Sequence, residues 1–155
     1  LGDFEVVQRG DRWTIVPAAR YGPLRNWQAL GAPFYPWEMK YAKRFKVNGV
    51  AGKSYYVKAD RWTGSLVEVW VNGRKAGIVF AEPYTLDVTP FVRKGKNDVE
   101  LRVVGNMENL IGPHHVAYDG IVDPNRWNVP QLRKASEYFL TPFGLQEDFA
   151  LVECE

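Results

Sequence analysis

Apolar and polar residues alternate through the middle of the chain. Valines recur at every second position over residues 67–71, and Asn72-Gly73 separates this run from a second apolar run over residues 76–80. Asn-Gly tolerates the positive φ angles of a two-residue turn, and a period of two is typical of a strand with one buried face. The pattern therefore predicts a β-hairpin, and the same alternation over residues 99–103 predicts a further strand.

Shorter segments with strand-like patterns flank this centre. Gly10-Asp11 is a turn signal between two of them, and Lys43 falls on the otherwise apolar face of another. Thr89-Pro90 predicts an N-cap and the first residue of one helical turn, which Gly95 stops. The flanking strands are predicted over residues 4–8, 12–17, 39–47, 54–59, 137–140 and 149–153.

Two long segments, residues 18–36 and 111–130, are interrupted by glycine and proline and are rich in aromatic side chains. Loops of this length in a compact domain are usually functional or packed by their own side chains. No segment has a sustained helical period. Short strands with turn signals between them predict an all-β fold, an antiparallel β-sandwich with one short helical turn.

The composition fits one domain over residues 1–155, with a core large enough to need no disulfide; Cys154 has no second cysteine to pair with. The net charge of +2 comes from 20 basic and 18 acidic residues that are interspersed, so no basic stripe indicates nucleic acid. No apolar run approaches the roughly 20 residues that span a bilayer, so we expect no membrane insertion. The chain begins at Leu1 rather than Met, and we expect it to be a piece of a larger protein.

Residues 64–105 combine several motifs in a fixed order: V-x-V-N-G over residues 69–73, a following Gly77, P-Y-x-x-D-V-T over residues 83–89, and a G-x-N-x-V-E strand over residues 95–103. Together these motifs resemble the sugar-binding jelly-roll domains of family 2 glycoside hydrolases and related galactose-binding-like modules. One position, Leu101, departs from the pattern, which has Val there.

The flanking sequence is similar to modules attached to large glycosidases, including the C-terminal modules of α-L-rhamnosidase-like enzymes. The similar stretches are residues 27–45, 109–113 and 138–145. The resemblance implies a jelly-roll module without catalytic acids of its own. It also implies carbohydrate and the catalytic domain of the parent protein as partners, and export to the periplasm or cell surface of a bacterium.

Flat aromatic rings can pack against the C–H faces of a sugar while polar neighbours bind its hydroxyls. We predict such a site in the loops, with the alternative that any one of these rings plugs the end of the sandwich. Trp70, opposite the buried valines, is predicted to pack beneath a loop or to face a partner domain. The predicted stacking residues are Trp27, Tyr35, Trp37, Trp62 and Trp127, and the predicted hydrogen-bonding residues are Asn109, His114 and Asp119.

We expect no cofactor, although the resemblance implies that a structural calcium ion is possible. Asp3, Asp119 and Glu153 are the candidate ligands, without the spacing of an EF-hand loop. For the adjacent His114-His115, a hydrogen-bonding role is favoured over zinc because no third ligand is suitably spaced. Glu108, Asp119 and Asp123 lie in one region, yet nothing marks two of them as the carboxylate pair of a glycosidase.

These observations favour a non-catalytic carbohydrate-binding or accessory module of a glycoside hydrolase. One alternative is a purely structural module between domains, which predicts an exposed apolar patch. Another alternative is an independent glycosidase, which requires two carboxylates in one pocket.

Overall fold

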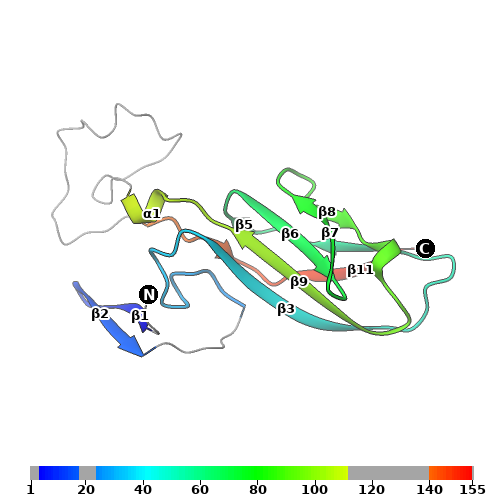
Figure 1. Ribbon diagram of the computed structural model, residues 1–155, viewed down its shortest axis with the longest axis horizontal. Helices are drawn as coiled ribbons and strands as arrows, with labels where there is room; N and C mark the ends of the chain where they lie inside the picture. Colours follow the sequence, from blue (N-terminus) through cyan, green and yellow to red (C-terminus); the bar gives the residue numbers. More distant parts are fainter. Residues whose placement is uncertain (1–3, 18–23, 112–139, 155) are drawn as a thin grey trace.

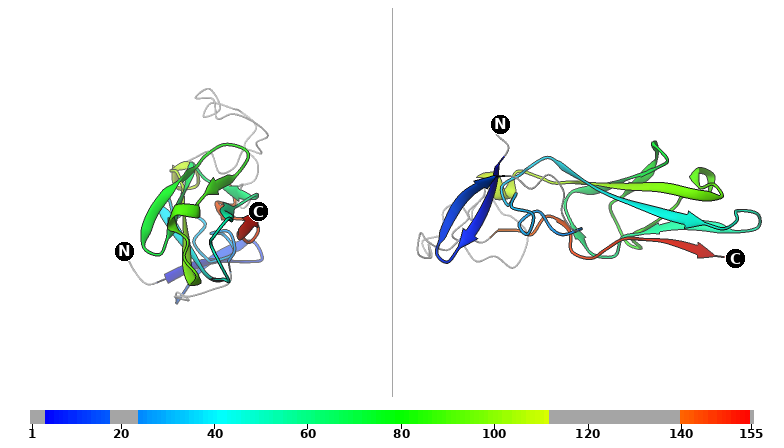
Figure 2. Two further views of the ribbon diagram at one scale, coloured as in Figure 1. Left: turned by 90° about the vertical axis from the view of Figure 1, so that its right-hand side faces the viewer. Right: turned by 90° about the horizontal axis from the view of Figure 1, so that it is seen from below.

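Two antiparallel sheets face each other across one hydrophobic core in the computed structural model, which describes residues 4–17, 24–111 and 140–154. Figure 1 shows the long strands side by side, and the right-hand view of Figure 2 shows residues 4–17 and residues 150–154 at opposite ends of the molecule. The predicted all-β antiparallel sandwich is confirmed. The four-stranded sheet has the order β3 (Glu38–Val47), β9 (Gly95–Val104), β6 (Leu66–Val71) and β7 (Arg74–Val79), and the three-stranded sheet has the order β11 (Ala150–Cys154), β4 (Ser54–Lys58) and β8 (Thr85–Asp87).

The apolar side chains that alternate with polar ones in the sequence are the side chains that point into the core. The inward side chains of β6 and β9 are 0% exposed, and side chains from the opposite sheet complete the cluster. Burying a valine or leucine side chain contributes roughly 1.5–3 kcal/mol, so this layer dominates the stability of the sandwich. The fully buried residues include Val67, Val69, Val71, Val99, Leu101 and Val103 from the larger sheet, with Tyr55 and Val57 from the smaller one.

The predicted hairpin joins β6 to β7 through Asn72-Gly73. Asn72 has a φ of 52° and Gly73 a φ of 78°, the two positive values that a tight turn of this type needs. The Asn72 side chain also donates to the Phe91 carbonyl at 3.0 Å and to Asn97 Oδ1 at 2.9 Å. The turn is therefore tied to the loop that leads into β9.

Asn97 is the buried end of this connection, with 0% of its surface exposed. Its Oδ1 also accepts from the Arg93 backbone N–H at 2.9 Å. Its Nδ2 donates to the Arg93 carbonyl at 2.7 Å and to the Gly95 carbonyl at 3.2 Å. One buried amide thus holds the loop over residues 93–96 in place, because each of these backbone groups would otherwise lose its partner.

Lys43 interrupts the apolar face of β3, and the structure gives the reason. Its Nζ donates to Asp148 Oδ2 at 2.6 Å and to the Phe149 carbonyl at 3.2 Å. The same ammonium lies 5.3 Å from the ring centroid of Phe45 and 5.4 Å from that of Phe149. Lys43 therefore places its ammonium over two rings and ion-pairs with Asp148.

The predicted helical turn is present as the 3-10 helix η1 (Thr89–Phe91), but its N-cap is Val88, so the prediction of Thr89 as N-cap is wrong. The Thr89 hydroxyl instead accepts a hydrogen bond from the Tyr55 backbone N–H at 2.8 Å. Asp87 Oδ1 accepts from the Thr89 backbone N–H at 2.9 Å, as its predicted turn-supporting role requires.

The closing segment differs from its prediction. The last strand lies one residue later than predicted, and Leu140 is outside any strand; residues 137–139 lie outside the described part of the chain. The sequence patterns also missed several short elements. These are β5 (Trp62–Thr63), its antiparallel partner β10 (Gly144–Leu145), the strand β8 (Thr85–Asp87), and the short helix α1 (Glu108–Ile111).

The predicted N-terminal hairpin, β1 (Phe4–Arg9) with β2 (Arg12–Pro17), is a separate two-stranded sheet beside one end of the sandwich (Figure 1). The Val6 backbone N–H donates to the Gly31 carbonyl at 2.6 Å, and the Trp13 ring lies 5.7 Å from that of Phe34. Across the described ranges, no helix has the length and apolar character needed to cross a bilayer.

Candidate functional site

Trp27 lies in the core at the end of the sandwich and is 1% exposed. Its ring fits between two glycines: a Cβ at Gly105 would lie 2.5 Å from the six-membered ring, and one at Gly144 would lie 2.7 Å from Nε1. The rings of Phe143 and Tyr35 lie 5.6 and 5.7 Å away. Trp27 therefore has no exposed ring face for a sugar, and the plugging alternative describes it.

Tyr41 of β3 packs beside the indole of Trp27. Its hydroxyl donates to the Arg25 carbonyl at 2.9 Å and accepts from the Leu145 backbone N–H at 3.3 Å. Burial raises the pKa of Tyr41 to about 12, because the ionised phenolate would lose its hydration. The phenol is thus a structural hydrogen-bonding group that joins residues 24–31 to β10.

Asn109 is also structural. It is 3% exposed, and its Nδ2 donates to the Pro33 carbonyl at 2.8 Å and the Thr141 carbonyl at 2.7 Å. Its Oδ1 accepts from the Thr141 backbone N–H at 2.9 Å. The amide ties α1 to two other segments, which occupies the groups that were predicted to bind sugar hydroxyls.

Tyr35 and Trp37 are the predicted stacking residues that reach solvent. Tyr35 is 39% exposed and packs edge-on against Trp27, whereas Trp37 is 64% exposed. The Trp37 carbonyl accepts from the Gly105 backbone N–H at 2.6 Å. The two rings are thus presented by backbone that is attached to the sandwich.

Trp62 lies in β5. Its ring packs edge-on against Tyr84 at a centroid distance of 5.7 Å and is partly buried. Its Nε1 is buried and has no hydrogen-bond partner in the described part of the chain. Among the described members of the predicted aromatic set, Trp27 is therefore core, Tyr35 and Trp37 are exposed, and Trp62 is partly buried.

The other predicted binding residues are His114, Asp119 and Trp127, and they lie outside the described residues, as does Asp3. Glu153, the remaining calcium candidate, pairs with the Lys53 ammonium and accepts from the Tyr55 hydroxyl at 2.7 Å. Both contacts lower the pKa of Glu153. Within the described ranges, no three His, Cys, Asp or Glu side chains gather as metal ligands do.

The outer face of the four-stranded sheet has a hollow of ≈ 390 Å³ beside Trp70. Trp70 Nε1 donates to Glu68 Oε2 at 3.0 Å, and the Arg102 guanidinium lies 4.1 Å from the centroid of the Trp70 ring. A charged side chain, rather than a loop, therefore packs on the ring. The hollow is lined chiefly by Ala42, Arg44, Trp70, Asp98, Glu100 and Arg102.

The two carboxylates in this hollow are already paired. Asp98 accepts from Arg44 at 2.5 Å, and Glu100 accepts from Arg102 at 2.5 Å. The Arg44 guanidinium lowers the pKa of Asp98, whereas a general acid of a glycosidase needs a raised pKa. The geometry is that of ion pairs on a solvated sheet face.

The fold is thus an antiparallel β-sandwich module with structural polar networks at its end. No family model matches the sequence. Over 125 residues, the chain is 32% identical to a putative β-glucuronidase of Formosa agariphila. The matched region is 76% of this chain and 11% of that protein. The chain therefore spans about a tenth of the length of this curated relative.

Among solved structures too, this chain matches a small part of larger glycosidases. A rhamnosidase from Novosphingobium sp. PP1Y matches 97% of this chain with a TM-score of 0.61 and 26% identity, using 14% of its own chain. An FMN-binding β-glucuronidase from Facaelibacterium prausnitzii L2-6 matches 97% of this chain and 21% of its own, with a TM-score of 0.50 and 18% identity, and shows the shared fold. The predicted resemblance to glycoside hydrolase modules is confirmed.

Proposed function

We propose that this chain is a non-catalytic β-sandwich module of a glycoside hydrolase. The observation that carries the proposal is the match of nearly the whole chain to a small part of a rhamnosidase, 97% against 14%. A module of such a size leaves most of the larger protein for other domains, among which we place the catalytic one. Asp98 and Glu100, the carboxylates in the hollow, support the same proposal because both are bound by arginines.

We further propose that the module contacts carbohydrate through Trp37, with Tyr35 beside it. Trp37 exposes 64% of its surface, and an indole with an accessible face can pack on the apolar face of a sugar ring. The hydrogen bond from Gly105 to the Trp37 carbonyl limits movement of this segment, which lowers the entropy lost on binding.

A second function, positioning of the catalytic domain, is favoured by a different observation. Exposed apolar side chains occur next to Gly105 and on α1: Met107 is 49% exposed, Leu110 44% and Ile111 58%. Such side chains suit an interdomain contact. One module can combine both functions: Trp37 contacts the sugar, and α1 contacts the neighbouring domain.

Titration with rhamnosides, glucuronides and galactosides tests the carbohydrate proposal. Two-dimensional NMR resolves the indole N–H signals, so binding at Trp37 is expected to shift its signal at millimolar sugar. Trp37→Ala is expected to weaken the binding about fivefold or more, which corresponds to about 1 kcal/mol.

Phe80→Ala is the matched control, because Phe80 is 69% exposed and lies in the loop between β7 and β8. It is expected to leave the affinity unchanged. A titration that moves no signal, or an equal loss in both variants, would remove carbohydrate binding at Trp37 and leave the positioning function.

A further inference from the structure

The far end of the outer sheet face concentrates positive charge. Lys46 of β3 and Lys96 of β9 are directly opposite each other in the sheet register, and both are exposed. Like charges in directly opposed positions destabilise a sheet. A chain that only needed a stable sheet would gain from an acidic residue at either position, so the pair invites a functional explanation.

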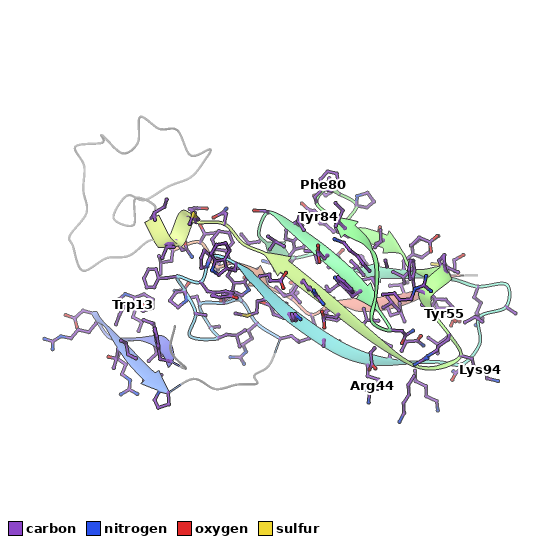
Figure 3. All side chains as sticks on the ribbon, in the orientation of Figure 1. Trp13, Arg44, Tyr55, Phe80, Tyr84 and Lys94 are labelled. Atoms are coloured by element: carbon purple, nitrogen blue, oxygen red, sulfur yellow. The ribbon has the colours of Figure 1, made fainter. Side chains whose placement is uncertain are left out.

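Three more cations surround this pair. Arg93 and Lys94 immediately precede β9, and Arg93 Nε donates to the Lys96 carbonyl at 3.4 Å. Arg44 is in the next row of the same face. Figure 3 shows the labelled Arg44 and Lys94 in the same half of the molecule, with Lys94 nearer its end. We call Arg44, Lys46, Arg93, Lys94 and Lys96 the basic end.

One carboxylate partly offsets this charge. Asp98 pairs with Arg44 at 2.5 Å, and its pKa is lowered by Arg44 first and also by the charges of Arg93 and Lys96. Three of the five cations therefore act on the pKa of Asp98. Five cations with this one carboxylate leave a strong positive field over a small, solvent-exposed area.

We propose that the basic end binds an anionic glycan that carries uronate carboxylates. Neighbouring strands place side chains about 4.8 Å apart, and alternate residues along a strand are about 7 Å apart, so Arg44, Lys46 and Lys96 present charges at spacings that successive acidic groups of a polymer can follow. All five members are cations and none supplies a ring for base stacking, which favours a glycan over single-stranded nucleic acid. The choice of a glycan over other polyanions rests on the proposed function.

The basic end is separate from the proposed Trp37 site. Trp37 precedes β3, whereas Lys46 is the ninth residue of that ten-residue strand. About 30 Å of extended chain separates them. The two sites can therefore fail independently: loss of binding at the basic end would leave both the accessory role and the Trp37 contact unaffected.

The test compares the triple variant Lys46→Gln, Lys94→Gln, Lys96→Gln with a control triple variant of equal charge, Lys40→Gln, Lys58→Gln, Lys75→Gln. Affinity electrophoresis in gels containing sodium polygalacturonate measures binding, with neutral dextran as the matched polymer. At about 20 mM salt, polygalacturonate is expected to retard the unaltered chain, and the basic-end variant is expected to bind at least about tenfold more weakly. The control variant should change by less than about threefold.

Retardation that weakens at about 300 mM salt supports the proposal, because exposed charges are then screened. Three results would overturn it: no retardation by polygalacturonate at low salt, equal retardation by dextran, or equal losses in the two triple variants. Equal affinity for poly-L-glutamate or single-stranded DNA would also overturn it, since the basic end would then be a general polyanion contact. Thermal melting confirms that each variant is folded.

Discussion

Replacing Trp27 with alanine is expected to lower the free energy of unfolding by about 3–5 kcal/mol, the range for removal of a large core aromatic side chain. Trp27 is 1% exposed and its ring fits between Gly105 and Gly144. The indole occupies the space that the missing side chains of Gly105 and Gly144 leave. Alanine at position 27 therefore leaves a cavity that the neighbouring backbone cannot easily close. The residues around β10 lose their packing partner at the same time.

Urea denaturation of the two proteins measures this difference. Trp37→Ala is the matched control, since it removes the same side chain from a position that is 64% exposed, and it should change stability by no more than about 0.5 kcal/mol. If Trp27→Ala cost no more than Trp37→Ala, the ring could not be the plug that the structure describes.

The second large effect is expected at Asn97. Asn97→Leu should cost about 2–4 kcal/mol, because it leaves several partly buried hydrogen bonds of the amide unmade. The partners in these bonds are the backbone groups of Arg93, the carbonyl of Gly95 and the side chain of Asn72. The leucine also has to fit a site that is shaped for a smaller, polar group.

Asn48→Leu serves as the comparison, because Asn48 is exposed in the turn after β3. It makes the same chemical change away from the core and should be close to neutral. Hydrogen exchange adds a local readout: the Arg93 amide is expected to exchange faster in Asn97→Leu. Unchanged stability together with unchanged exchange at Arg93 would contradict the structural role of Asn97.

Local patterns were sufficient to predict most of the sheet. The hairpin followed from Asn72-Gly73 because the required φ angles restrict the residue choice, and the core strands followed from a period of two. The long strand β3 was predicted for the same reason, whereas β9 was predicted only over residues 99–103 and begins earlier, at Gly95. Lys43 weakened the pattern of β3, since its contacts with Asp148 and the core rings are visible only in the fold.

The role of each aromatic residue could not be read from the sequence. Trp27 and Trp37 lie in the same proline-rich stretch, yet one is core and the other is exposed. What separates them is the space between Gly105 and Gly144, which comes from segments far apart in the chain. Asn109 is a similar case, because its partners Pro33 and Thr141 are 76 and 32 residues away.

The basic end illustrates the same limit. Arg93, Lys94 and Lys96 are close together in the sequence, but Lys46 joins them only through the register of β3 with β9. Short pairs such as β5 with β10 were missed because two residues carry no periodicity. Both the basic end and the pairing of β5 with β10 depend on contacts between segments far apart in the chain, which a period-two pattern does not predict.

Hydrolysis assays on the 155-residue chain test the non-catalytic role most directly. The folded chain is incubated with p-nitrophenyl α-L-rhamnoside and p-nitrophenyl β-D-glucuronide, and release of p-nitrophenol is measured. We expect no release above the buffer rate, because Asp98 and Glu100 are held in ion pairs and the pKa of Asp98 is lowered. Release that rises in proportion to the concentration of the chain, and that Glu100→Gln abolishes, would contradict the account.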